Sequence, residues 1–227
     1  MKKAFTLSYD DGVLQDKRFV SLLNKYGLKC TFNLNSGLMN SGIKKLYKEN
    51  VFVSRMDSEG LKELYAGHEI AVHGAKHIRL SNASKEETNR EILEDKKALS
   101  KMFACDIEGA AYAYGQANEY TKEVFQNSGI KYSRSTKTTG NFNPSADMFF
   151  YESTCHHSDE KLFELAKEFI ELKPVKPQIF YVWGHTYEFD EDESQWERIE
   201  EFFKLISGHN DILYGTNIEV FKYFNLV

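Results

Sequence analysis

Strand-like and helix-like stretches alternate along nearly the whole chain, and this alternation restricts the fold more than any other feature. Residues 5–9 alternate apolar and polar side chains, as a half-buried strand does, and apolar residues then recur at helical spacing up to Gly27. Repeated strand–helix units predict a parallel sheet covered by helices, and so many units in one domain favour a closed or nearly closed barrel. A doubly wound open sheet is the alternative.

The remaining elements are predicted from the same two patterns. Strands are expected at 30–34, 69–73, 107–114, 131–134, 178–183 and 211–214. Helices are expected at 58–67, 84–103, 118–128, 160–171, 194–207 and from Thr216 onward. Ser84 and Glu87 have capping-box spacing, which is typical of a helix N-terminus.

Composition narrows the classes of partner. A chain of 227 residues with 41% hydrophobic residues and no Pro/Gly-rich linker predicts one domain over residues 1–227. A net charge of −5 gives no electrostatic reason to expect nucleic acid or an anionic membrane as a partner. Three scattered cysteines without CxxC spacing indicate reduced thiols, and no signal-like apolar stretch precedes Asp10. We therefore expect a cytoplasmic protein, or a secreted one if a signal segment has been removed.

Polar side chains stand at the C-terminal ends of three expected strands. Asp10 and Asp11 follow the first strand, His73 ends the strand at 69–73, and His185 follows the strand at 178–183. In parallel α/β folds, ligands gather at this end of the strands. These residues are therefore expected to meet on one rim.

The pair His73 and His77 indicates a metal site. At i, i+4 spacing on one helical turn, both imidazoles would lie on the same face. With the Asp11 carboxylate they make a set of two nitrogens and one oxygen that leaves a coordination position open for water, as catalytic sites require. Such a set accepts zinc, cobalt, nickel, manganese or iron. The alternative is two histidines at the start of a helix.

Asp10 then has a separate role. A carboxylate that is kept off the metal can take a proton from a water whose pKa the metal lowers. The alternative for Asp10 is an ordinary turn or helix-capping residue.

Three short stretches in this order and spacing carry a family resemblance: "SYDDG" at 8–12, "HGAKH" at 73–77 and "WGH" at 183–185. They resemble the motifs of the polysaccharide deacetylases, carbohydrate esterase family 4, and the resemblance runs from about residue 4 to 187. It implies a distorted (β/α)7 barrel and metal-dependent hydrolysis of an N- or O-acetyl group on a sugar.

The resemblance also implies residue roles. Asp10 would be the general base, and Asp11, His73 and His77 would hold one divalent ion, with zinc expected first. His185 would be the general acid. In "AYAYG" at 111–115, Tyr114 would offer a backbone N–H to the oxyanion; a packing role is its alternative.

The chain departs from the family at two places. Family members often have an Arg and a Pro in the third motif, where this chain has Ala111 and Ala113. We hypothesise that Arg134, at the end of the next strand, supplies the missing cation. The later Asp and Trp motif is not recognisable in 133–141, so no residue is predicted to orient His185.

Three residues are predicted to line the substrate pocket. Trp183 and Tyr187 flank His185 and could stack on a sugar, although core packing is the alternative. His156 lies in "STCHHSDE" at 153–160, a stretch that taken alone suggests a second metal site or a nucleophilic Cys155. Adjacent residues on a strand point to opposite faces, so its Cys, His, His and Asp are not all expected to reach one ion.

The leading hypothesis is a metal-dependent hydrolase acting on an acetylated amino sugar or polysaccharide. A small intracellular acylated sugar or amide is an alternative substrate. A catalytically weakened carbohydrate-binding homologue is suggested by Ala111. An isomerase-like barrel that uses the same metal for proton transfer is a third hypothesis.

Overall fold

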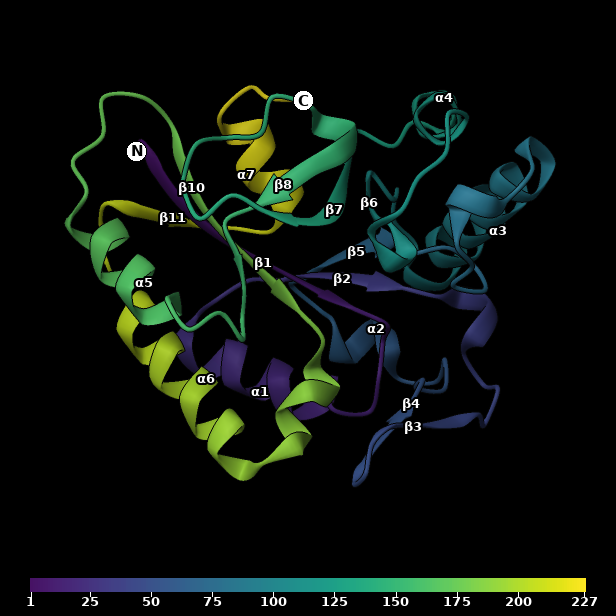
Figure 1. Cartoon of the computed structure of the whole chain (residues 1–227), viewed down its shortest axis with the longest axis horizontal. Helices are drawn as coiled ribbons and strands as arrows, with labels where there is room; N and C mark the ends of the chain where they lie inside the picture. The colour runs from purple at the N-terminus through teal and green to yellow at the C-terminus, as the bar shows by residue number, and fades with distance from the viewer.

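One parallel sheet of nine strands organises the computed structural model, which describes residues 1–227 (Figure 1). The strand order is β8-β7-β6-β5-β2-β1-β10-β9, and β11 also pairs with β1. The strands are β1 (Lys3–Asp10), β2 (Thr31–Leu34), β5 (Glu69–Val72), β6 (Gly109–Ala111), β7 (Tyr132–Thr138), β8 (Tyr151–Ser153), β9 (Cys155–His156), β10 (Gln178–Gly184) and β11 (Ile212–Tyr214). Every pairing in this sheet is parallel, which confirms the α/β prediction.

The two ends of the strand path meet in the chain. Only Thr154 separates β8, which pairs with β7, from β9, which pairs with β10. The backbone N–H of Thr154 donates to the carbonyl of Tyr181 in β10 at 2.9 Å. One extended segment therefore turns the sheet back toward its other edge, as in a barrel.

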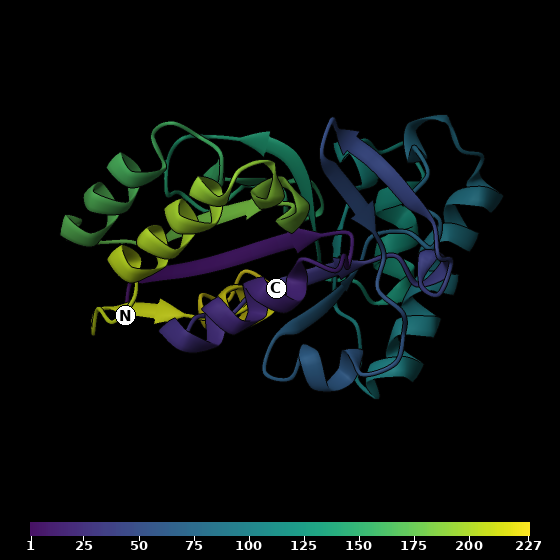
Figure 2. The same cartoon turned by 90° about the horizontal axis from the view of Figure 1, so that it is seen from below.

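Helices cover the outside of this sheet (Figures 1 and 2). They are α1 (Asp16–Tyr26), α2 (Leu61–Leu64), α3 (Lys85–Phe103), α4 (Thr121–Ser128), α5 (Leu162–Glu171), α6 (Glu193–Ile206) and α7 (Asn217–Tyr223). Helix α6 packs against both α1 and α5, while α3 packs against α4. No helix has the length and hydrophobicity needed to cross a bilayer.

Local signals set most helix ends as expected. Gly27, at φ 63°, ends α1 in the left-handed conformation that glycine adopts without strain. The capping box of Ser84 and Glu87 begins α3. Two predicted elements are longer than the observed ones. The helix predicted at 58–67 contains only the short α2. The strand predicted at 107–114 contains only β6, because a tight turn at Ala113–Gly115 replaces its last residues.

A hairpin that the sequence analysis missed lies over the C-terminal ends of the strands. Strands β3 (Lys44–Lys48) and β4 (Val51–Ser54) pair antiparallel and stand apart from the main sheet in both views (Figures 1 and 2). Strand β3 is exposed along its whole length, so it lacks the apolar face that marks a core strand. The hairpin supplies part of the wall of the site.

Candidate metal and catalytic site

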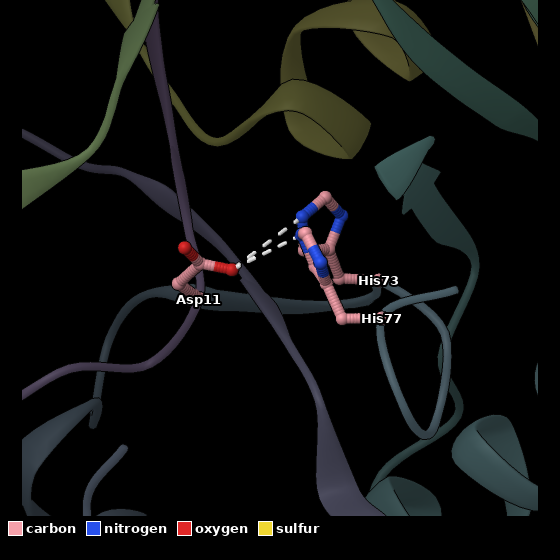
Figure 3. Close-up of side chains that lie close together, drawn as sticks. All are labelled: Asp11, His73 and His77. Atoms are coloured by element: carbon pink, nitrogen blue, oxygen red, sulfur yellow. Dashed lines mark ion pairs between the residues drawn. The ribbon is translucent and has the colours of Figure 1, made fainter. Parts of the chain in front are cut away.

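Asp11, His73 and His77 lie together at the C-terminal rim of the sheet (Figure 3). Asp11 directly follows β1, and His73 directly follows β5. Oδ1 of Asp11 is 3.8 Å from Nε2 of His73 and 3.4 Å from Nε2 of His77. The structure thus brings together the three residues that the sequence predicts as metal ligands.

The predicted helical turn for the two histidines is wrong. Residues 74–77 form a loop rather than a helix, and the backbone of His77 is left-handed at φ 54°. Gly74 turns the chain at φ 83°, a conformation that favours glycine. The imidazoles converge because this loop folds back, so their i, i+4 spacing is not the cause.

Backbone strain is concentrated at this rim. Of six non-glycine residues with positive φ, three belong here: Asp11 at 88°, His77 at 54° and Tyr114 at 59°. Such conformations cost about 1–3 kcal/mol each and persist where the surrounding structure enforces them. The strain therefore makes this rim a candidate functional site.

The donor set fits a divalent ion. The Nδ1–H of His73 donates to the carbonyl of Ala111 at 2.9 Å, which leaves the lone pair on Nε2. That nitrogen faces oxygens of Asp10 and Asp11, each 3.8 Å away. Burial lowers the pKa of His77 to about 4, so this ring is neutral and able to ligate. A cation between these facing acceptors would satisfy all of them.

Asp10 is held beside this set as an ionised carboxylate. Arg134, only 1% exposed, donates to Oδ1 at 2.7 Å and to Oδ2 at 2.5 Å, and Asn33 donates to Oδ1 at 2.8 Å. Burial alone would raise the pKa of Asp10, but Arg134, together with His73 and His185, more than offsets it and holds this pKa well below its usual range. Arg134 thus occupies the position in which the sequence hypothesis places a cation.

His185 faces Asp10 from the end of β10. Its Nε2 is 3.9 Å from Oδ2 of Asp10, while its Nδ1–H donates to Oε1 of Glu188 at 2.9 Å. Burial lowers the pKa of His185, but the hydrogen bond to Glu188 and the nearby aspartates more than offset this and raise it. Glu188 was not predicted; its position three residues after His185 was the only signal that could have found it.

Arg55 is a second residue that sequence reasoning missed. It follows β4, and its guanidinium donates to Oδ1 of Asp11 at 2.6 Å and to Oδ1 of Asn35 at 3.2 Å. Burial raises the pKa of Asp11, but Arg55 and the neighbouring histidines lower it by more. No motif marks Arg55, because it reaches the rim only through the hairpin.

A cavity of about 240 Å³ opens beside Asp11 and His77. Asp11, Arg55, His77, Tyr114 and Tyr187 line it together with residues of the hairpin. The Tyr114 ring lies 4.6 Å from that of His77, between centroids. Tyr187, which the sequence predicts to contact substrate, lines this cavity.

The other predicted pocket residues lie elsewhere. Trp183 is 8% exposed, and the guanidinium carbon of Arg134 lies 4.4 Å from the centre of its ring. His156 lines a separate cavity with Glu188. Cys155 is fully buried and its burial raises the pKa of the thiol, which argues against a nucleophilic role.

A model of the polysaccharide deacetylase family matches residues 1–133. The chain belongs to this family. It is similar to a Streptococcus pyogenes deacetylase, PplD, solved with acetate (24% identity, 61% of this chain and 58% of that chain, TM-score 0.53). It is also similar to a family 4 carbohydrate esterase from Streptomyces lividans solved with acetate (13% identity, 94% and 92%, TM-score 0.59). No curated protein matches the chain.

One structural neighbour is described as a pseudoenzyme. A pseudoenzyme of carbohydrate esterase family 4 from Bacillus anthracis is 14% identical, with 96% of this chain and 65% of that chain covered, at a TM-score of 0.64. This chain spans 58% of the Streptococcus deacetylase, and identities this low show the shared fold alone. The neighbours therefore support the barrel-type α/β fold and leave activity to the residues of the site.

Proposed function

We propose that this protein is a metal-dependent hydrolase that removes an acetyl or related acyl group from an amino sugar or a small amide. The observation that carries the proposal is the Asp11, His73 and His77 trio, with Asp10 on one side and His185 within 3.9 Å of Asp10. Polymeric carbohydrate and a small acylated amine or sugar are both compatible with this arrangement.

Asp11, His73 and His77 would hold the ion. Two neutral imidazoles and one carboxylate suit zinc first, with cobalt, nickel and manganese as alternatives. When bound, the ion supplies Lewis acidity to the substrate carbonyl and acidifies the attacking water.

Asp10 is the general base in this proposal. Its Oδ2 lies 3.8 Å from Nε2 of His73 and therefore borders the ligand set. Because Arg134 keeps its pKa low, Asp10 is a weak base, and the water that it deprotonates has to be acidified within the site. Arg134 thus keeps Asp10 ionised and aimed at the trio.

His185 is the general acid, and Glu188 is its positioning residue. The Glu188 carboxylate fixes the ring through Nδ1, so Nε2 points toward Asp10 and the substrate side. A proton on Nε2 can then pass to the leaving nitrogen or oxygen. The backbone N–H of Tyr114, at the edge of the cavity, is the proposed oxyanion donor.

The alternative of a weakened homologue loses its motivation. It depended on Ala111, which stands where family members often have an Arg. Ala111 and Arg134 are direct partners in the β6–β7 ladder, so the cation comes from the neighbouring strand at the same level. The Ala111 substitution therefore does not remove the positive charge from Asp10. No contact favours the isomerase-like alternative.

The test combines turnover with metal content. Wild type loaded with zinc is assayed on acetylated amino sugars and small N-acyl amides, beside Asp10→Asn. We expect kcat to fall about 100- to 10,000-fold in Asp10→Asn, because the general base is lost, while the metal bound at the trio is retained. Undiminished turnover in Asp10→Asn would refute the assignment of the base.

Glu94→Gln serves as the matched control. Glu94 lies on α3, and it takes no part in the site. We expect wild-type turnover from this variant. A wild type that binds metal but releases no acyl group from any of these substrates would favour a binding protein.

A further inference from the structure

A second cluster of metal-ligating side chains lies beyond His185. Nε2 of His157 is 2.9 Å from Oε2 of Glu188, and Nε2 of His156 is 3.4 Å from the same oxygen. All three ligand atoms lie within 4.8 Å of one another. The donor set, two imidazoles and one carboxylate, has the composition of the Asp11 trio.

The separations match those around a small divalent ion. Ligand bonds of about 2.0–2.2 Å at angles between 90° and the tetrahedral value place neighbouring donor atoms about 2.8–3.6 Å apart. Both distances from Oε2 of Glu188 fall in this range. The ligand atoms need no large rearrangement to enclose an ion.

Each histidine is oriented through its other nitrogen. Nδ1 of His157 is 3.1 Å from the hydroxyl of Tyr9, and Nδ1 of His156 is 2.7 Å from Oγ of Ser158. A fixed Nδ1 partner is what orients metal-ligating histidines, because it sets the ring and leaves Nε2 for the ion. The Tyr9 hydroxyl can accept a proton from Nδ1 of His157. At His156 the backbone N–H of Ser158 also approaches Nδ1, at 3.3 Å, so binding an ion through Nε2 requires the tautomer whose Nδ1–H donates to Oγ of Ser158.

The backbone around the cluster is also held in place. Arg198 donates to the carbonyls of His157 at 2.5 Å and of Asp159 at 2.8 Å. The rule that adjacent strand residues point to opposite faces fails for His156 and His157, because β9 ends at His156. Both rings therefore turn toward Glu188, which comes from the segment after β10 and could not be found within 153–160.

The cluster is accessible from outside. A cavity of about 320 Å³ is lined by His156, His157 and Glu188, and also by Glu191 and Gln195. It provides an entry path and room for water in the remaining coordination positions. His157 itself is 3% exposed, so the ion would sit at the inner end of this cavity.

We propose that His156, His157 and Glu188 form a second binding site for a divalent transition metal ion, with zinc as the first choice. The composition of the set supports it, because two imidazole nitrogens and one carboxylate oxygen are ligands that zinc and similar ions accept. Glu188 uses Oε2 for the ion and Oε1 for His185. An ion in this site would therefore be tied through one carboxylate to the position of His185.

The experiment counts ions in the full chain. Wild type is incubated with excess zinc sulfate, desalted and analysed by plasma mass spectrometry. We expect about two zinc ions per chain in wild type, about one in His156→Ala, about one in His73→Ala, and none in the double variant. His209→Ala, which removes a histidine outside both clusters, is the matched control and keeps two.

The outcomes separate the two sites. One ion in wild type that disappears in His73→Ala would overturn the second site and leave the first intact. One ion that survives His73→Ala but disappears in His156→Ala would support the second site and contradict the proposed first one. Two ions retained in His156→Ala would also overturn the proposal. Because each single variant still has one site to load, the remaining ion shows that the variant has folded.

Discussion

The two ends of the parallel sheet hold a buried carboxyl group, Asp10, and a partly buried one, Glu69, and they affect them in opposite ways. At the C-terminal rim, Arg134 holds the pKa of buried Asp10 well below its usual range. At the opposite end, Glu69 begins β5 and accepts hydrogen bonds from Thr31 at 2.7 Å, Tyr132 at 2.8 Å and the backbone of Ile218 at 3.0 Å. Burial nevertheless raises the pKa of Glu69 to about 7.

The difference shows what keeps the rim reactive. Burial favours the neutral form of a carboxyl group at both ends, and neutral donors lower the pKa of Glu69 too little to offset it. At Asp10, a guanidinium in direct contact helps to reverse the effect. The rim therefore presents ionised carboxylates for metal and proton chemistry, whereas the opposite end holds a carboxyl group that serves the fold.

The largest effect should come from removing the cation at the rim. Arg134→Leu leaves Asp10 buried without its charged partner, and we expect the free energy of unfolding at pH 7 to fall by about 3–5 kcal/mol. Urea denaturation followed by circular dichroism measures it. The double variant Asp10→Leu with Arg134→Leu should regain much of this loss, because it buries no unpaired charge. Equal stability of the single and double variants would contradict the comparison.

A smaller effect is expected at the other end and depends on pH. Between pH 4.5 and 7 the folded chain keeps the Glu69 proton while the unfolded chain releases it, so this group makes stability fall as pH rises. In Glu69→Gln this contribution is absent. Relative to wild type, the free energy of unfolding of the variant should therefore rise by about 1–3 kcal/mol between pH 4.5 and 7.5.

Parallel denaturation curves at several pH values test this prediction. Burial also raises the pKa values of Asp16 and Asp95 to about 7. Both residues are present in wild type and in Glu69→Gln, so they contribute equally to the pH dependence of the free energy of unfolding in the two proteins. Glu94→Gln, which changes an exposed residue of α3, is the control and should follow the wild-type slope. If the difference in the free energy of unfolding between Glu69→Gln and wild type did not change over this pH range, Glu69 would be ionised in the folded protein.

The smallest effect belongs to an exposed ion pair. Lys25 and Glu200 are 2.5 Å apart, with side chains 60% and 36% exposed. Water and salt screen such a pair, so Lys25→Met should leave the denaturation midpoint in 0.15 M salt within error of wild type. A loss comparable to that of Arg134→Leu would mean that contact with a cation matters more than burial.

The residues of the rim can be predicted well from the sequence, because their positions depend on the order of strands and helices along the chain. Alternating strand and helix patterns imply parallel strands, and parallel strands place Asp11, His73 and His185 at one end whatever their separation in sequence. The same reasoning placed Arg134 on the strand next to Ala111. These predictions need only the ends of strands, which composition and periodicity locate within a few residues.

The missed features depend on contacts that no local pattern encodes. Arg55 reaches Asp11 through a hairpin whose outer strand has no buried face. Glu188 reaches His157 because two chain segments with no common motif end beside each other. The helical turn predicted for His73 and His77 failed for a related reason, since i, i+4 spacing also occurs in a loop that folds back at Gly74.

The left-handed backbone of Asp11, at φ 88°, has a consequence for the history of such a chain. Glycine at this position would relieve about 1–3 kcal/mol of strain and so offset part of the lost ion pair with Arg55. Folding therefore opposes the loss of this proposed ligand only weakly, and natural selection on the reaction has to maintain it. A descendant without that selection could keep the fold, lose the Asp11 carboxylate and persist as a stable protein with a different function.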